Sequence, residues 1–311
     1  MTERSKDSSM DSKKETEPQV TSEPKPPYPK QRQDHPGRGL ESEMTPRPRY
    51  LAARYRAAGK LTDKVALITG GDSGIGRAVA VLYAREGADV AIVYQPPEQS
   101  DAEEAKRAIE AEGRRCLLLP GDICEQAFCN EVVERTVQEL GDLNILVNNA
   151  AYLNSKTDLT QLTVEDWDRT FKTNIYAYFY LVMAALPHLK EGDAVIATAS
   201  EEALKGSPIM IDYAATKAAL VAFSKSLSPH LAEKGVRINV VAPGPTWTSL
   251  NVADQRMPEE RIAHLGETAD LKRVAQPEEL APVYVFLASD ADSSFITGEV
   301  VAATGGMTVT R

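Results

Sequence analysis

Residues 65–76 read VALITGGDSGIG, and this stretch decides the fold. Residues 65–68 form a short apolar run that favours a buried strand, and an amphipathic pattern over residues 76–86 predicts a helix. Glycines between a strand and a helix let the backbone turn tightly and approach a pyrophosphate, which the free N–H groups of the helix attract. A glycine cluster alone is weak evidence, but its place between these two elements favours a dinucleotide site.

The same alternation of strands and helices recurs along the rest of the chain. Apolar runs predict further strands at residues 90–93, 116–119, 145–147, 194–198, 237–241 and 299–302, and helices at 101–112, 125–140, 164–189 and 213–233. Strands that are apolar on both faces and separated by helices imply a parallel sheet that is covered on both sides. We therefore predict an α/β fold: a single Rossmann-type, doubly wound parallel sheet of about seven strands with helices on both faces.

The first 50 residues differ in composition from the rest of the chain. They hold eight of the nineteen prolines, many Ser, Lys and Glu, and almost no apolar periodicity. Such a segment buries too little surface to offset the entropy lost on ordering, although its second half carries scattered Tyr, Leu and Met. We divide the chain into a proline-rich leader, residues 1–50, which is either disordered or docked in extended form, and a Rossmann-fold domain, residues 51–311.

Length, charge and composition limit the class of protein. The 311 residues, 42% of them hydrophobic, can bury one large core, and the net charge of -10 makes nucleic acid an unexpected partner. No apolar stretch is long enough to span a membrane, and no secretory signal is present, so we expect a cytoplasmic protein without a membrane partner. The three cysteines and four histidines are scattered, so we predict no metal site and no disulfide.

The residues best suited to chemistry lie at strand ends and on one helix. Tyr213 and Lys217 are four apart at the start of a predicted helix, so both lie on one face. Proton transfer near neutral pH requires the phenol pKa to fall by about 3 units, or about 4 kcal/mol. A neighbouring ammonium in a site shielded from water, assisted by the positive nicotinamide of an oxidised cofactor, can supply this. A packed Tyr with an exposed Lys would show the same spacing. Ser200, residues 148–150 and residues 243–245 all follow predicted strands, so they should converge on the same crevice.

In this order, these features resemble the short-chain dehydrogenase/reductase family, whose pattern comprises Thr-Gly-x-x-x-Gly-x-Gly, Asn-Asn-Ala-Gly, a helix Asn, a strand-end Ser, Tyr-x-x-x-Lys and Pro-Gly. The resemblance runs from about Leu61 to Met307. Within the family the chain is similar to the branch with a proline-rich leader, the glucose and ribitol dehydrogenase homologues and bacterial general-stress oxidoreductases. The resemblance implies an enzyme that moves hydride between NAD or NADP and a small aldehyde, ketone or sugar-like polyol.

The resemblance also implies a role for individual residues. Tyr213 would be the general acid or base, and Lys217 would hold the nicotinamide ribose and lower the Tyr213 pKa. Ser200 would hydrogen-bond the reacting oxygen, and Asn174 would fix a proton-relay water. The implied cofactor-binding residues, besides Tyr213 and Lys217, are Gly70, Asp72, Ser73, Gly74, Ile75, Gly76, Tyr94, Asp122, Ile123, Asn149, Ala150, Pro243, Gly244, Thr246 and Thr248.

Several positions allow two interpretations. No acid and no base follows Tyr94 directly, so the choice between NAD and NADP stays open. Arg77 can approach a phosphate or be an ordinary exposed helix residue. Glu201 and Glu202 can face the substrate or form an exposed loop pair. Ala151 stands where the family has glycine, which predicts a small backbone adjustment.

Assembly and activity also have alternatives. The helices over residues 167–183 and 213–231 carry more small and aromatic residues than one sheet face needs. In the family that the chain resembles, the corresponding helices pair across a two-fold axis, which implies a homotetramer, with a dimer as the second choice. The loop over residues 248–271 is expected to cover the nicotinamide, and Pro229 to kink or interrupt its helix. The competing function is a catalytically silent dinucleotide-binding sensor or scaffold, but such a protein usually loses the Tyr or the Lys, and this chain keeps both.

Overall fold

Seven parallel strands form a single sheet in a computed structural model that describes residues 24–35 and 38–306. Their order is β3-β2-β1-β4-β5-β6-β7. The strands are β1 Val65–Thr69, β2 Asp89–Tyr94, β3 Cys116–Pro120, β4 Ile145–Asn148, β5 Ala194–Thr198, β6 Arg237–Pro243 and β7 Val300–Ala303. The predicted doubly wound parallel sheet is confirmed. The strand order reverses between β1 and β4, which opens a crevice at their carboxyl ends.

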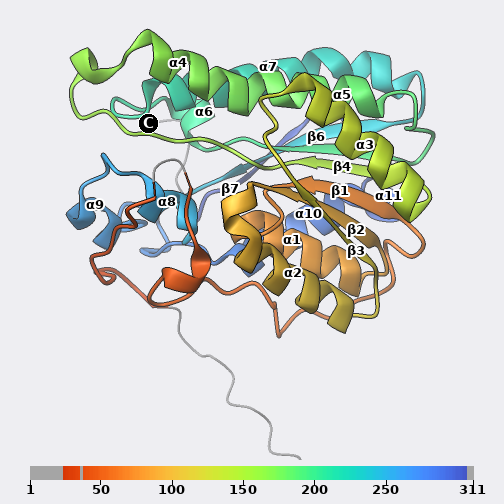
Figure 1. Cartoon of the computed structure of the whole chain (residues 1–311), viewed down its shortest axis with the longest axis horizontal. Helices are drawn as coiled ribbons and strands as arrows, with labels where there is room; N and C mark the ends of the chain where they lie inside the picture. The colour runs from red at the N-terminus through yellow and green to blue at the C-terminus, as the bar shows by residue number, and fades with distance from the viewer. Residues whose placement is uncertain (1–23, 36–37, 307–311) are drawn as a thin grey trace, which may run out of the picture.

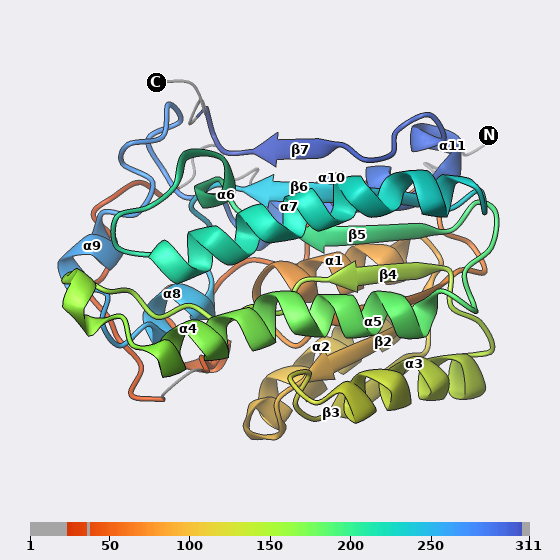
Figure 2. The ribbon, with the colours of Figure 1, turned by 90° about the horizontal axis from the view of Figure 1, so that it is seen from above.

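Helices cover both faces of the sheet (Figure 1). The layer with α1, α2 and α10 packs on one face, and the layer with α3, α4, α5 and α7 on the other (Figure 2). The helices are α1 Gly74–Arg85, α2 Gln99–Ala111, α3 Gln126–Leu140, α4 Val164–Phe171, α5 Ala177–Ala185, α6 Glu202–Lys205, α7 Ile211–Ala232, α8 Ser249–Ala253, α9 Glu259–Ala263, α10 Pro277–Ala288 and α11 Asp290–Ser293. Within the described residues, none of these is long and apolar enough to cross a membrane.

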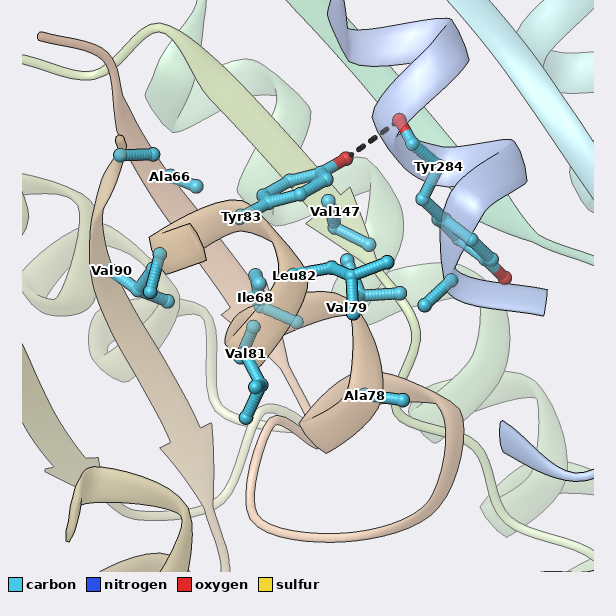
Figure 3. Packing of buried hydrophobic residues seen from close by; sticks show 14 of the residues in the cluster. Ala66, Ile68, Ala78, Val79, Val81, Leu82, Tyr83, Val90, Val147 and Tyr284 are labelled. Atoms are coloured by element: carbon cyan, nitrogen blue, oxygen red, sulfur yellow. Dashed lines mark hydrogen bonds between the residues drawn. The ribbon is translucent and has the colours of Figure 1, made fainter. Parts of the chain in front are cut away.

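The contact between α1 and α10 fixes the first helix on the sheet. Val79 and Leu82 are fully buried beneath α10, and the Tyr83 hydroxyl donates to the Tyr284 carbonyl oxygen at 3.1 Å (Figure 3). Burial of each such side chain contributes about 1.5–3 kcal/mol. The start of α1, which follows the glycine turn, is thereby held in place at the crevice.

Two helices differ from their predicted form. The helix predicted over residues 164–189 is continuous, but a π-helical turn, Lys172–Tyr176, separates α4 from α5. Pro229 does not interrupt its helix, because α7 runs through it to Ala232. Pro229 lies within the last turn of α7, where its missing N–H removes one hydrogen bond without interrupting the long preceding part.

The described part of the leader lies extended along the domain. The Tyr28 N–H donates to the Ala263 carbonyl oxygen at 2.7 Å, and the Gln33 N–H to that of Val252 at 2.9 Å. The segment therefore runs beside α8 and α9, although these follow it by more than 200 residues (Figures 1 and 2). A small separate core holds the two parts together: Tyr28, Met44, Trp247, Val252, Met257, Ile262 and Val274. Residues 1–23, also predicted to belong to the leader, lie outside the described residues.

Arg77 is neither exposed nor aimed at a phosphate, so both interpretations of it are wrong. Its side chain is fully buried, with Nη1 2.9 Å from Oε2 of Glu41, a leader residue. Its Nη2 lies 3.6 Å from a carboxylate oxygen of Asp101, and its Nε donates to the Asp72 carbonyl oxygen. Glu41 is also fully buried, and its Oε1 accepts the Gly74 N–H at 2.6 Å. A buried ion pair therefore joins the leader to the glycine turn.

We expect Glu41→Ala to lower the free energy of unfolding by about 3–5 kcal/mol, because it leaves the buried Arg77 guanidinium short of one carboxylate. Urea unfolding at neutral pH measures the change. The matched control is Glu43→Ala, two residues away, where the side chain is exposed and pairs with His35. Equal stabilities of the two variants would contradict the structural role assigned to the pair.

Candidate active site

A cavity of about 600 Å³ opens at the carboxyl ends of the strands. Of the residues predicted for the site, those in its wall are Gly70, Asp72, Ser73, Gly74, Ile75, Tyr94, Asp122, Ile123, Asn149, Ala150, Ser200, Tyr213, Lys217, Pro243, Gly244, Thr246 and Thr248. Gly76 and Asn174 lie outside the wall and act through neighbouring residues. The strand ends thus bring together side chains from six strands and from α7, as the topology requires.

The glycine turn packs tightly against the end of β4. A Cβ atom on Gly76 would lie 1.9 Å from the Gly70 carbonyl oxygen and 2.6 Å from Asn149 Nδ2, so only glycine fits. Gly70 and Gly74 have φ angles of +63° and +52°, in the left-handed region that favours glycine. Asn149 Nδ2 donates to the carbonyl oxygens of Thr69 and Gly70 at 3.1 and 3.2 Å. The turn is therefore rigid, and it presents the start of α1 to the cavity.

These features fit a dinucleotide. The N-terminus of α1 offers N–H groups and a positive dipole end to a pyrophosphate, and the glycines leave room for its close approach. Asp72 Oδ2 is buried without a hydrogen-bond partner among the described residues, and Asp72 lines the cavity, so it can accept a hydrogen bond from a ligand hydroxyl. Asp122 is exposed at the end of β3, where one carboxylate oxygen accepts the Cys124 N–H at 2.9 Å.

The residues predicted for catalysis meet where β5 ends against α7. Tyr213 is 9% exposed, and its phenol shares a hydrogen bond with the Ser200 hydroxyl. Lys217 Nζ lies 5.5 Å from the Tyr213 ring centroid and donates to the Thr198 carbonyl oxygen at 2.7 Å. Ser200, Tyr213 and Lys217 therefore line one corner of the cavity, with the phenol and the amine one turn of α7 apart.

The pKa values of both Tyr213 and Lys217 are shifted by their burial in this corner of the cavity. Burial raises the pKa of Tyr213 to about 12, despite the lowering effect of the Ser200 hydrogen bond. Burial also lowers the pKa of Lys217 to about 7. The protein by itself therefore does not lower the Tyr213 pKa, because loss of hydration disfavours both charged forms, and the lowering expected with an oxidised cofactor bound stays a prediction. The phenol is protonated at neutral pH.

Asn174 is buried within the π-helical turn, where its side chain links two other segments. Its Oδ1 accepts the Tyr152 N–H at 2.8 Å, and its Nδ2 donates to the Tyr152 carbonyl oxygen at 3.1 Å and to Thr216 Oγ1 at 3.0 Å. Thr216 Oγ1 in turn donates to the Tyr213 carbonyl oxygen at 2.7 Å. The side chain connects the loop after β4 to α7, and its role in holding a relay water stays a prediction.

The two acids after Ser200 are not an exposed loop pair. Glu201 is 6% exposed, Glu202 is half-buried, and both line the cavity. Lys205 Nζ lies 2.9 Å from Glu201 Oε1 and 3.7 Å from Glu202 Oε1. Burial raises the pKa of both carboxyls. Ala151, by contrast, has no positive φ angle, so the alanine at this glycine position causes no backbone strain.

Sequence reasoning missed the cavity residues that come from the leader and from the loop after β2. Arg38, Gly39 and Glu98 line the cavity beside Ser73 and Tyr94. No local pattern marks Arg38 or Gly39, because they lie in a proline-rich stretch far from the motifs they join. The scattered Tyr and Met of the leader were the available signal, since Tyr28 and Met44 are the residues that anchor it.

Known proteins match nearly the whole of this arrangement. Residues 70–308 match the family described as enoyl-(acyl carrier protein) reductase. General stress protein 39 of Bacillus subtilis is 52% identical over 272 residues, which are 88% of this chain and 94% of that protein. The chain belongs to the short-chain dehydrogenase/reductase family. The motifs implied this family and an NAD(P)-dependent oxidoreductase, and both predictions are confirmed.

Other members carry more specific names. The NADPH-dependent aldehyde reductase 1 of Arabidopsis thaliana is 42% identical and covers 90% of this chain and 98% of its own length. The crystal structure of a short chain dehydrogenase from Burkholderia cenocepacia in complex with NADP has a TM-score of 0.73 and 32% identity, and covers 79% of this chain and 98% of its own. Related solved structures hold NADPH or NAD.

The buried Lys217 should cost stability in a pH-dependent way. Its pKa is about 7 in the folded protein, against an ordinary value of 10.5, so the unfolded chain binds more protons between these pH values. Wild-type stability should therefore rise with pH across this window, whereas Lys217→Met lacks this dependence. In thermal unfolding, the Tm of the wild type should therefore gain on the Tm of Lys217→Met as the pH rises from 7 to 10. The difference, variant minus wild type, should fall steadily over this range. Lys225→Met, which changes an exposed lysine of the same helix, should show no such trend.

Proposed function

We propose that the protein reduces small aldehydes, ketones or sugar-like carbonyl compounds with a nicotinamide cofactor, with Tyr213 as the general acid. One observation carries the proposal: the protonated Tyr213 phenol, paired with Ser200 and beside Lys217, faces the same cavity as the glycine turn. The 42% identity to a protein named as an NADPH-dependent aldehyde reductase supports reduction of an aldehyde.

Ser200, Tyr213 and Lys217 would each perform a different part of the reaction. The Ser200 hydroxyl donates a hydrogen bond to the carbonyl oxygen of the substrate and holds it beside the Tyr213 phenol. A bound reduced nicotinamide supplies the hydride. Tyr213 donates its proton to the same oxygen as the carbonyl carbon is reduced, so an alcohol is formed. Lys217 stabilises the resulting phenolate through its ammonium, in a cavity where low polarity strengthens that attraction. The reverse sequence oxidises the alcohol.

The acids beside Ser200 favour neutral, hydroxyl-bearing substrates. Glu201 Oε2 and Glu202 Oε2 are buried and have no hydrogen-bond partner among the described residues. Such atoms are satisfied when a ligand hydroxyl donates to them, whereas a substrate carboxylate would meet like charge. We therefore place hydroxyaldehydes and sugar-like polyols ahead of keto acids.

A catalytically silent sensor is the weaker proposal. It would need the cofactor turn but not the corner of the cavity with Ser200, Tyr213 and Lys217, so a protein without turnover has no chemical reason to keep these three residues there. The chain retains all three, and they line the cavity that contains the glycine turn.

A panel of aliphatic aldehydes, hydroxyaldehydes, aldoses and keto acids, each with NADH and with NADPH, tests the proposed substrate class. Absorbance of the reduced nicotinamide gives the rates. We expect kcat/KM for a hydroxyaldehyde to exceed that for a keto acid of equal length by at least about tenfold, the effect of one well-placed hydrogen bond or like charge. Faster reduction of keto acids would overturn the assignment to Glu201 and Glu202.

Tyr213→Phe should lower kcat by about 10²–10⁴-fold, because the acid is lost while the ring still packs. Cofactor affinity, measured by the fluorescence of the bound reduced nicotinamide, should remain. Tyr180→Phe on α5 is the matched control, since Tyr180 does not line the cavity. Residual turnover near the wild-type rate would show that another group supplies the proton.

We also propose that the protein is a homotetramer. Tyr176, Phe179 and Met183 are 44–47% exposed along the π-helical turn and α5, with Trp167 at 39% on α4. Such a row of large apolar side chains is typical of an interface. Light scattering coupled to size exclusion should give the mass of four chains, and Phe179→Glu should yield a smaller species, whereas a monomeric wild type would refute the proposal. A cytoplasmic location and a domain of residues 51–311 stay predictions.

A further inference from the structure

Residues 38–41 of the leader complete the cofactor end of the cavity. Arg38 and Gly39 line it together with Ser73 of the glycine turn and with Tyr94 and Glu98 at the end of β2. In dinucleotide folds the residues after the second strand face the ribose that carries the adenine. This part of the wall thus comes from two segments that are far apart in sequence.

The backbone that follows Arg38 is held by specific contacts. The Gly39 N–H donates to the Glu98 carboxyl, and a Cβ on Gly39 would lie 2.6 Å from the Ser249 carbonyl oxygen. The Gln33 side chain pairs with the Leu40 backbone, where its Oε1 accepts the N–H at 2.7 Å. Glu41 follows with its buried bonds to the glycine turn. The position of Arg38 at the cavity wall is therefore set by the fold.

The Arg38 guanidinium has no partner of its own. Within residues 24–35 and 38–306, no ion pair and no side-chain hydrogen bond involves this group, although Arg38 is half-buried. Arginine at a cavity wall usually forms such bonds, and its planar fork matches a phosphate group with two parallel hydrogen bonds. The chain offers no other base directly after β2, where Gln95 is followed by two prolines.

The Glu98 carboxyl is bound by backbone N–H groups and forms no ion pair with Arg38 among the described residues. The carboxyl of Glu98 accepts the N–H groups of Gln95 and Gly39. Burial and the proximity of Asp72 raise the pKa of Glu98, and burial also raises the pKa of Asp72. Both shifts favour the neutral carboxyl, which weakens Glu98 as a carboxylate that would select the free ribose hydroxyls of NAD.

We propose that Arg38, carried by the N-terminal segment, binds the 2'-phosphate of NADP(H) and makes the protein prefer the phosphorylated cofactor. The inference rests on the cofactor part of the proposed function and on no particular substrate. Glu41 and Gly39 are positioning residues for Arg38, because they fix the segment to the glycine turn and to the loop after β2.

Binding of cofactor to the full chain tests the proposal without substrate. Titration calorimetry should show that Arg38→Gln raises the Kd for NADPH by about 10–100-fold, the loss of a charged bidentate contact. The Kd for NADH should change less than about twofold, because NADH has no 2'-phosphate and so loses no contact with Arg38. The fragment 2',5'-ADP should lose affinity as NADPH does, and 5'-ADP should not. Unchanged NADPH binding, or equal losses for NADPH and NADH, would overturn the proposal.

Two controls separate this result from other failures. Arg56→Gln removes an exposed arginine outside the cavity, which contacts the Ala53 carbonyl, and should leave all four Kd values unchanged. The Tm of Arg38→Gln without cofactor should equal that of the wild type, since the side chain makes no bond to lose. If no carbonyl substrate is ever reduced but NADPH still binds more tightly than NADH through Arg38, the proposed function fails and this inference stands.

Discussion

The close contact between the start of α1 and the end of β1 is the constraint on which the site depends. Gly76 lies so near the Gly70 carbonyl oxygen that no side chain fits between them. This contact fixes the width of the crevice, and Asn149 then joins the turn to the end of β4. The Thr69 hydroxyl accepts the N–H groups of Asn149 and Ala150, at 2.9 and 3.1 Å. The cofactor end is therefore rigid before any ligand arrives.

The leader and the loop after β6 meet at the same place. Glu41 bonds to Gly74 at the start of α1, and Gly39 packs against Ser249 at the start of α8. The small core around Trp247 holds the leader to α8 and α9, and the Trp247 indole donates to the Pro46 carbonyl oxygen at 2.8 Å. The leader therefore connects the loop after β6 to the glycine turn.

The sequence could predict the sheet and most of the cavity wall, because each motif follows its own strand and the topology brings strand ends together. Long-range partners could not be predicted. Glu41 and Gly74 are 33 residues apart without any shared pattern, and this pairing is what makes Arg77 a buried residue. The environment of Glu201 was missed for a similar reason, since its N–H donates to the carbonyl oxygen of Pro243 at the distant end of β6.

Burial of the reacting pair explains why the Tyr-x-x-x-Lys spacing predicts position better than protonation. Spacing places the phenol and the amine on one face of α7, but loss of hydration favours the neutral form of each. The charges that would restore a phenolate must then come from what the cavity binds. In the proposed reaction, Tyr213 would stay protonated beside a neutral reduced nicotinamide and would donate to a carbonyl oxygen. Beside a positively charged oxidised nicotinamide, the phenolate would be favoured and would accept a proton from an alcohol. The charge of the bound cofactor would then set the direction in which Tyr213 moves its proton.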